Sequence, residues 1–431
     1  MSKQAGLSFE QAPPFSVPLR FFVTAPVFLV AGAMIILLKP EAMSSRWTPQ
    51  ALALTHALTL GFLAMVMIGA LMQILPVVAG ATLPRPKLVA GFTHTSLLIG
   101  TIALLAGFLG TGRAAFIAGS ILLGAGFAAF VTASAWCLAH AATNATVTGI
   151  RLAVGCLGLT VALGLDLVFM LAGGVAMPAS QTAVVAHPAL GLIGGVFLLV
   201  ISVAYQVVPM FQITPPYPQS LARGLTITIF ILLMLHSIAP LLKGVAQHLV
   251  AWIADYGLAA VILSFAITTL KLESRRRRKL PDTTLNFWQV GMASLILSVV
   301  VWLSGQAWPA WGADPGYAPL LGVLFIVGFA TSVVNGMLYK IVPFLAWFHL
   351  QAQLDARVGA IPNMKQMIQE RWMRMQFRLH IAACILLALA VIRLHLLAFP
   401  AAAMMGISAL LLEANLISAV RRFLTHGGRL A

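Results

Sequence analysis

Three histidines have the side chains best suited to hold a metal or a metal-containing cofactor: His56, His187 and His236. Each lies within or at the start of a long apolar segment, where a polar side chain needs a partner because water is absent. A neutral imidazole carries one nitrogen lone pair that binds copper, zinc or haem iron. The alternative for each ring is a hydrogen bond to a serine, a threonine or a backbone carbonyl group.

Other polar side chains within apolar segments are candidates for a proton or ion path. Asp166 and Glu413 are the deepest acidic residues, and intramembrane acids are functional candidates by default. Glutamine or lysine occupies three further positions of this kind, at Gln73, Gln206 and Lys340. The alternative for Asp166 is a buried hydrogen bond, and for Glu413 an ion pair with a helix-end arginine.

The composition indicates which class of protein must position these side chains. Of the 431 residues, 61% are hydrophobic and 8% are charged, whereas soluble domains carry roughly 25% charged residues. This excludes a soluble enzyme, a disordered protein and a secreted disulfide scaffold, and it predicts a polytopic membrane protein. The net charge of +16 comes from basic residues on short connecting segments. Such residues set orientation in a bilayer, so we expect lipid and not nucleic acid as the partner.

Apolar runs of about 20 residues are long enough to cross the hydrocarbon core as helices. We expect twelve spans, at residues 20–38, 51–78, 88–110, 114–139, 149–174, 186–210, 222–242, 248–270, 286–305, 317–346, 377–397 and 399–421. They form a single transmembrane domain over 20–421, between a cytoplasmic N-terminal segment (1–19) and a cytoplasmic tail (422–431). Residues 1–18 are polar and proline-rich, so we expect the first run to be a retained helix and not a signal peptide.

The distribution of basic residues predicts the orientation. With twelve spans, 21 of the 26 lysines and arginines fall on the side shared by both termini, which places the termini in the cytoplasm of a bacterial inner membrane. His56, His187 and His236 then lie in the outer half of the bilayer. His380 is expected near the cytoplasmic interface as an interfacial or solvated side chain, and residues 362–376 are expected to form a short interfacial helix.

A motif recurs in the second, sixth and tenth spans. Gly61, Gly194 and Gly328 each precede a polar residue by twelve positions, and a proline follows that residue by three. The glycines are 133 and 134 residues apart. The pattern predicts an all-α fold built from three pseudo-repeats of four helices, over about 20–140, 149–270 and 286–421. A glycine within a transmembrane helix permits close helix approach, so we expect the three glycines at close helix contacts.

This architecture, together with the stretch from His56 through Gly61-Phe62 to Pro76, resembles the large subunit of haem-copper oxidases, including nitric-oxide reductases. It is also similar to the NnrS-type haem- and copper-binding membrane proteins. The resemblance implies that His56, near the outer end of the second helix, ligates haem. It implies copper ligation by His187, which opens the sixth helix before Pro188, and by His236 on the seventh, so that all three are expected cofactor-binding residues.

The tenth span departs from that pattern, because residues 317–346 contain no histidine. We therefore expect a divergent relative that binds haem, copper or both in respiratory, nitric-oxide or copper-related metabolism, and not a complete terminal oxidase. A respiratory-complex subunit or an electron donor is the expected partner. Two alternatives stay open: a permease without a cofactor, which would use the polar path residues, and an assembly factor for a respiratory complex. The sequence leaves open whether the protein is an enzyme.

Overall fold

The computed structural model describes residues 12–79, 83–173, 180–277, 280–354 and 361–430. Within these residues the chain is helical and has no strand. Twelve of the described helices are long and apolar enough to cross a membrane. The protein is therefore an all-α multi-pass membrane protein, as the sequence predicts.

The twelve spans agree with the predicted ones to within a few residues at most ends. In seven of them, one α-helix forms all or most of the span: α1 (Ser16–Leu38), α4 (Pro86–Ala106), α5 (Arg113–Ala139), α6 (Ala145–Leu171), α9 (Gln219–Ile238), α10 (Gly244–Ser274) and α11 (Thr283–Ala307). The last two spans are α15 (Glu370–Ile392) and α16 (Leu394–Thr425). Short elements connect spans at η2 (Pro40–Met43), η6 (Ala239–Leu241), α12 (Pro309–Gly312) and η8 (Met364–Gln366).

The second, sixth and tenth spans each contain a π-helical segment between two α-helical parts. The three spans are α2 (Pro49–His56), η3 (Ala57–Ala64) and α3 (Met65–Ala79); α7 (Ser180–Ala189), η5 (Leu190–Phe197) and α8 (Leu198–Gln212); and α13 (Tyr317–Gly322), η7 (Val323–Thr331) and α14 (Ser332–Gln353). The segments begin at residues 57, 190 and 323, so successive starts are 133 residues apart. Such segments are rare and occur frequently at functional sites.

Each π-helical segment contains one glycine of the repeated motif, and that glycine faces the preceding span. The pairs are Gly61 with Phe28 of α1, Gly194 with Cys156 of α6, and Gly328 with Ser294 of α11. A Cβ atom at Gly194 would lie 2.6 Å from Cys156 Cβ, and one at Gly328 would lie 2.8 Å from Ser294 Cβ. The predicted close helix contacts are therefore confirmed, while the superposition of whole four-helix repeats stays a prediction.

A second small residue follows each of these glycines by eight positions and also faces the preceding span. A Cβ atom at Gly69 would lie 2.7 Å from Phe21 Cβ, and one at Gly336 would lie 2.9 Å from the nearest α11 side chain. Ser202 occupies this position in the sixth span, opposite Gly149 of α6. Two small residues on the same face of a helix let two helix backbones approach closely. The three spans therefore use the same packing device.

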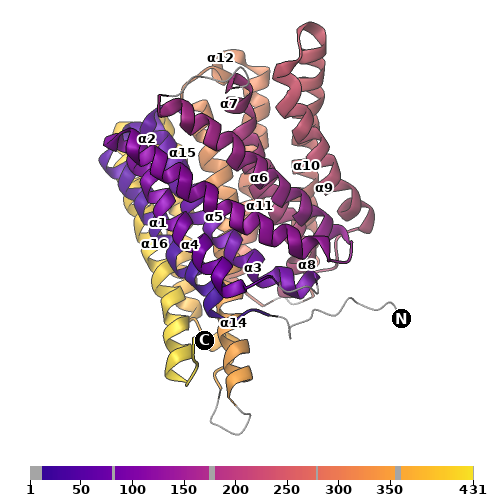
Figure 1. The fold of residues 1–431 in the computed structure, drawn as a ribbon, viewed down its shortest axis with the longest axis vertical. Coiled ribbons are helices and arrows are strands. Elements are labelled where there is room, and N and C mark those ends of the chain that lie inside the picture. The colour runs from indigo at the N-terminus through magenta and orange to yellow at the C-terminus, as the bar shows by residue number, and fades with distance from the viewer. Residues whose placement is uncertain (1–11, 80–82, 174–179, 278–279, 355–360, 431) are drawn as a thin grey trace. The chain divides into compact units, whose positions relative to one another are not determined.

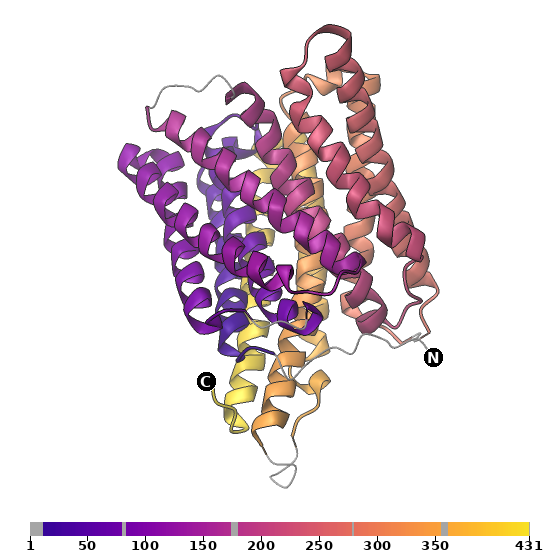
Figure 2. The ribbon, with the colours of Figure 1, turned by 45° about the vertical axis from the view of Figure 1, so that its right-hand side comes forward.

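The described chain forms two compact units, and the division falls within α3. Unit 1 consists mainly of residues 71–279, and unit 2 of residues 14–70 with 280–431. In unit 1, α4 packs along α5, and α6 packs on η5 and α8. The helices α9 and α10 form a hairpin that Figure 2 shows in red. The first span and most of the second span of the predicted first repeat thus group with the third repeat.

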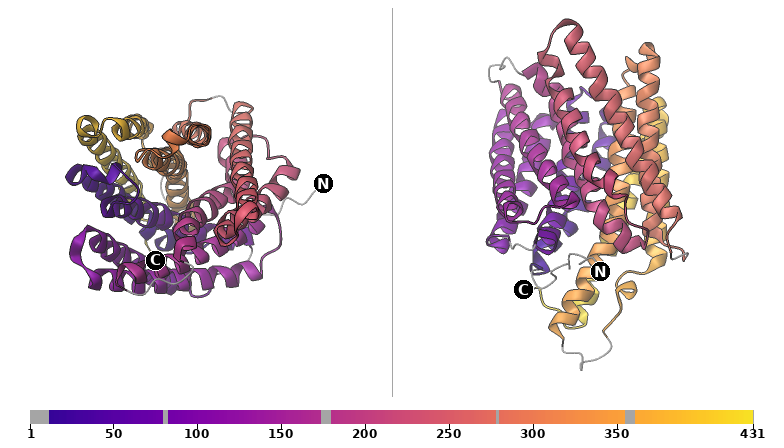
Figure 3. Two further views of the ribbon diagram at one scale, coloured as in Figure 1. Left: turned by 90° about the horizontal axis from the view of Figure 1, so that it is seen from above. Right: turned by 90° about the vertical axis from the view of Figure 1, so that its right-hand side faces the viewer.

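Unit 2 is organised around α16. This helix packs along α15, to which Arg393 joins it directly (Figure 1). On another side α16 lies against α1, as the view from above in Figure 3 shows with yellow beside indigo. The span with η7 and α14 packs on α11. These contacts bury the polar side chains described below.

The predicted interfacial helix at 362–376 is wrong. Residues Met364–Gln366 form a single 3-10 turn, and the spanning helix α15 begins at Glu370. The buried side chains of α15 follow each other at steps of three and four: Met373, Gln376, His380, Ala383, Leu387 and Ala390. The predicted span begins at residue 377, but the buried stripe already includes Met373 and Gln376. Packing against neighbouring helices therefore extends the span toward its N-terminus.

Candidate functional site

His56 closes α2, directly before the first π-helical segment. The Thr48 side chain caps this helix by accepting a hydrogen bond from the backbone N–H of Ala51 at 3.1 Å. The Nδ1 atom of His56 lies 2.7 Å from the carbonyl oxygen of Leu52, one turn earlier. Because a carbonyl oxygen only accepts, Nδ1 carries the proton and Nε2 carries the lone pair. Histidines that bind metals usually have this tautomer, held by such an oxygen.

His187 lies on α7, and its side chain contacts α6. Its Nδ1 atom lies 3.0 Å from the carbonyl oxygen of Thr160, which gives the same tautomer as in His56. The ring covers Gly164, where an added Cβ atom would lie 2.9 Å from His187 Cε1. The absence of a side chain at Gly164 therefore makes room for the imidazole. The hydrogen bond to a backbone carbonyl was one of the two interpretations of this histidine, and it is compatible with ligation through Nε2.

His236 is paired with an acidic residue that the sequence analysis did not single out. Its Nδ1 atom lies 2.6 Å from Oδ1 of Asp255, across the α9–α10 hairpin. The two side chains are 25% and 33% exposed. A carboxylate that accepts from Nδ1 is a common support for a metal-binding histidine, but it is also an ordinary ion pair. The pairing depends on the hairpin geometry, which residue types alone do not reveal.

The three histidines are divided between the two units. His56 belongs to unit 2, whereas His187 and His236 belong to unit 1. Within unit 1, Ala186 and Leu190 share a hydrophobic cluster with Leu233, which packs α7 against α9. No three or more histidine, cysteine, aspartate or glutamate side chains gather to hold a metal ion among the residues described.

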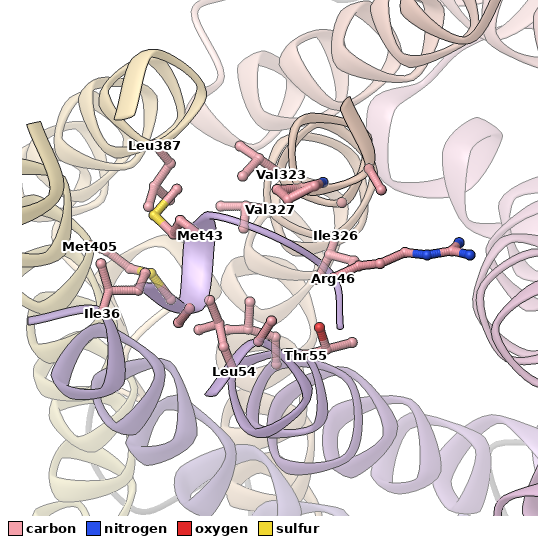
Figure 4. A pocket seen from close by; sticks show the side chains of 16 residues that line it. Ile36, Met43, Arg46, Leu54, Thr55, Val323, Ile326, Val327, Leu387 and Met405 are labelled. Carbon is pink, nitrogen blue, oxygen red and sulfur yellow. The ribbon is translucent and has the colours of Figure 1, made fainter. Parts of the chain in front are cut away.

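A pocket of roughly 100 Å³ lies in unit 2, next to the turn that carries His56 (Figure 4). Its walls come from α2, η3, α13 and η7, and two methionines, Met43 and Met405, contribute their thioethers. Thr55 supplies a hydroxyl group, and Arg46 extends away from the apolar side chains at the edge. Ligand pockets usually measure about 300–1,000 Å³. This cavity therefore has room for a small apolar molecule or for part of a larger one.

Lys340, one of the predicted path residues, forms an ion pair. Its Nζ atom lies 2.9 Å from Oδ2 of Asp282, and the side chains are 18% and 22% exposed. Asp282 also accepts hydrogen bonds from the backbone N–H and the hydroxyl group of Thr284, so it caps α11. Burial raises the pKa of the Asp282 carboxyl, but the Lys340 ammonium and the Thr284 hydrogen bonds outweigh it and hold the pKa below its usual value.

The other predicted path residues lie on separate helices. Gln73 on α3 has a buried Oε1 atom that accepts no hydrogen bond from the described residues. Gln206 on α8 and Asp166 on α6 are half-buried. Glu413 on α16 is also half-buried, and its Oε2 atom has no hydrogen-bond partner within the described part. A path through these residues stays a prediction.

His380 lies in the core of unit 2, so the interfacial or solvated position expected for it is wrong. The residue is 4% exposed, and its Nε2 atom lies 2.8 Å from Oγ of Ser332 on α14. One turn earlier, Gln376 donates a hydrogen bond to Ser408 Oγ of α16 at 3.0 Å. Asn415 of α16 donates to the hydroxyl group of Tyr339 at 2.9 Å. The three-and-four spacing of the α15 stripe is the signal that could have located His380.

No protein-family model matches this chain, and no curated protein matches it.

Proposed function

We propose that this chain is a divergent haem-copper-oxidase-like membrane protein that binds haem through His56. The observation that carries this proposal is the position of His56: directly before a π-helical segment, with Nδ1 bonded to the Leu52 carbonyl oxygen. That arrangement fixes the imidazole plane and directs the lone pair to Nε2. The resemblance of this stretch to the second helix of haem-copper oxidases supports the assignment. Haem is preferred to copper because the donor set supplies single imidazoles.

The chain contributes ligation and orientation. Haem bound by a histidine supplies one-electron redox chemistry or binds a diatomic gas. The carbonyl oxygen of Leu52 holds the ring of His56. The pocket is lined by the neighbouring Thr55 and by mostly apolar side chains, and His56 itself is not part of its lining. Residues 317–346 contain no histidine, and His349 lies near the C-terminal end of α14. The chain therefore has no histidine at the early positions of the tenth span, where the oxidase family has its ligands. An electron-transfer or gas-sensing role in respiratory or nitric-oxide metabolism follows.

The basic residues support the location that we propose. Both termini face the cytoplasm of a bacterial inner membrane, because 21 of the 26 lysines and arginines lie on that side of the twelve spans. His56 then lies in the outer half of the bilayer. An electron donor on the outer side or a subunit of a respiratory complex is the partner that fits this depth.

Absorbance spectroscopy on purified variants tests the haem ligand. His140 is the matched control, because its Nδ1 atom lies 2.8 Å from the carbonyl oxygen of Trp136 four residues earlier, as in His56, but the residue is exposed. We expect His56→Ala to lose most of the reduced-minus-oxidised haem signal and His140→Ala to keep it. Gel filtration establishes that both variants are folded. An unchanged signal in His56→Ala would contradict the proposed ligand.

A permease without a cofactor is the second candidate. It is favoured by buried polar atoms that have no hydrogen-bond partner in the described chain, among them both amide atoms of Asn335, a residue that is 1% exposed. Such groups are normally satisfied by ordered water or by a ligand. Folded protein that contains no haem would favour this second function.

A further inference from the structure

The last turn of α10 contains a carboxyl group that the sequence analysis did not single out. Glu273 is 2% exposed, and neither of its carboxylate oxygens has a hydrogen-bond donor among the described residues. It also lies at the C-terminal end of a 31-residue helix, where the helix dipole disfavours a negative charge. A buried carboxylate without donors is unstable in its charged form and takes up either a proton or a cation.

The polar side chain next to the Glu273 carboxyl is that of Gln212, the last residue of α8. Gln212 is 4% exposed and faces the Glu273 carboxyl, yet its own Oε1 atom accepts no hydrogen bond in the described chain. The Gln212 side-chain NH2 group is the nearest donor to the carboxyl and can serve one of its oxygens. The Gln212 Oε1 atom and the other carboxyl oxygen are then two buried acceptors without a donor in the described chain. A proton on Glu273 would supply that donor, because a carboxylic acid O–H can donate to the amide oxygen.

Two tyrosines complete the surroundings. The hydroxyl group of Tyr217 lies 2.9 Å from Thr269 Oγ1, one turn before Glu273 on α10. Tyr205 of α8 packs edge-on against Tyr217 with ring centroids 5.3 Å apart, and its buried hydroxyl group has no hydrogen-bond partner within the described residues. The chain after α10 is held to the chain after α8, because the Arg277 N–H donates to the Ile213 carbonyl oxygen at 3.0 Å.

Few charged or titratable groups face this carboxyl. Arg276, beyond the end of α10, attracts its charged form, and Tyr217 faces it from the α8–α9 connection. Tyr205 of α8 faces Tyr217. The tenth span has a tyrosine at the position of Tyr205, but there Asn415 donates to the Tyr339 hydroxyl group at 2.9 Å. The tyrosine hydroxyl group at this position is therefore hydrogen-bonded in unit 2, whereas that of Tyr205 in unit 1 has no partner among the described residues.

We propose that Glu273 is a proton-binding site: its carboxyl group takes up a proton, donates it in a hydrogen bond to Gln212, and exchanges it with water beside Arg276. This places a proton acceptor at the end of α10 that carries the basic run from residue 275. The inference rests on unit 1 alone and does not depend on the haem proposal.

Infrared spectroscopy of the purified chain tests this site. We expect the C=O stretch of a protonated carboxyl in the wild-type spectrum at neutral pH, and we expect its main component to be lost in Glu273→Gln. Glu413→Gln is the matched control, since Glu413 is another carboxyl within a span with an unpartnered oxygen; it should keep the Glu273 component. Identical carboxyl bands in wild type and Glu273→Gln would overturn the proposal. Loss of the band on adding sodium ions would also overturn it, in favour of a cation site.

A second measurement needs no variant and applies if Glu273→Gln does not fold. Dicyclohexylcarbodiimide modifies protonated carboxyls in apolar surroundings, and peptide mass mapping of the wild-type chain locates the label. Glu41 is exposed and serves as the internal reference. We expect Glu273 to be labelled on the order of tenfold more than Glu41 at neutral pH, because an apolar environment favours the neutral form of a carboxyl group. Equal or weaker labelling of Glu273 would contradict the proposal.

Discussion

Replacing the repeat glycines with alanine should destabilise the protein in a graded order. The Cβ atom of Gly61→Ala would overlap the ring of Phe28 and lie 2.6 Å from Phe28 Cβ, which cannot rotate away. Non-bonded carbon atoms prefer separations of about 3.5–4.0 Å. Overpacking of a filled core costs about 1–3 kcal/mol, occasionally more, and we place Gly61→Ala at the upper end of that range.

The two other glycines should cost less. In Gly194→Ala the new Cβ atom would lie 2.6 Å from Cys156 Cβ and 2.9 Å from Leu233 Cδ2. In Gly328→Ala the nearest atoms are Ser294 Cβ and Oγ, both at 2.8 Å, and the hydroxyl group can rotate. We expect about 2 kcal/mol for Gly194→Ala and about 1 kcal/mol for Gly328→Ala.

Two glycines provide matched controls within the same units. An added Cβ atom at Gly155 of α6 or at Gly322 of α13 would meet nothing within 4 Å. Alanine in an unobstructed helix is favoured over glycine by about 0.5–1 kcal/mol, so Gly155→Ala and Gly322→Ala should be neutral or stabilising. The opposite signs separate steric overlap from helix propensity.

Thermal unfolding in detergent measures these differences. The thiols of Cys137 and Cys156 in unit 1 are fully buried, and that of Cys384 in unit 2 is half-buried. A thiol-reactive fluorophore therefore reports the exposure of each unit on unfolding. A change of 1 kcal/mol shifts Tm by about 2–4 °C for a unit of roughly 150–250 residues. The expected order of Tm is Gly61→Ala lowest, then Gly194→Ala, then Gly328→Ala, with both controls at or above wild type. A Gly61→Ala protein as stable as Gly155→Ala would refute the close packing of α1 on η3.

Two further substitutions test the buried polar contacts with the same assay. Lys340→Gln introduces the residue that the first two repeats have at this position, and it should destabilise unit 2 by about 2 kcal/mol. Breaking a fully buried ion pair costs about 3–5 kcal/mol. The cost here should be smaller because the two side chains are 18% and 22% exposed. The pKa of Asp282 in the folded protein lies below its unfolded value of about 3.9. The stability difference between wild type and Lys340→Gln should therefore be complete above about pH 4 and shrink as pH falls further. A stability difference that grows in acid would contradict the ion pair. His380→Ala should cost about 2–4 kcal/mol because it leaves Ser332 without its partner in a cavity, whereas His140→Ala should stay within about 0.5 kcal/mol; equal stabilities would contradict the buried position of His380.

The spans could be predicted from hydropathy because lipid leaves the backbone no alternative to helix over a long apolar run. The glycine spacing also predicted close contacts, since only a missing side chain allows two backbones to approach at Gly61, Gly194 and Gly328. The π-helical segments that contain these glycines could not be predicted, because an extra residue in a helical turn depends on how the neighbouring span packs.

The polar contacts were the least predictable part. Lys340 and Asp282 are 58 residues apart, and their pairing depends on α14 lying against α11. The predicted span begins at residue 377, which placed His380 near an interface, although its three-and-four spacing with Gln376 and Ala383 marks a buried face. The predicted eighth span ends at residue 270, so a buried position for Glu273 in the last turn of α10 could not be predicted from it.

The haem and metal content of the purified wild-type chain tests the central proposal most directly. The measurement is a pyridine haemochromogen spectrum combined with elemental analysis of iron and copper on the same sample. We predict haem with iron in stoichiometric amount to the protein, no stoichiometric copper, and loss of the haem in His56→Ala. Folded protein that carries neither haem nor iron, even after expression with haem supplied in excess, would contradict the proposal.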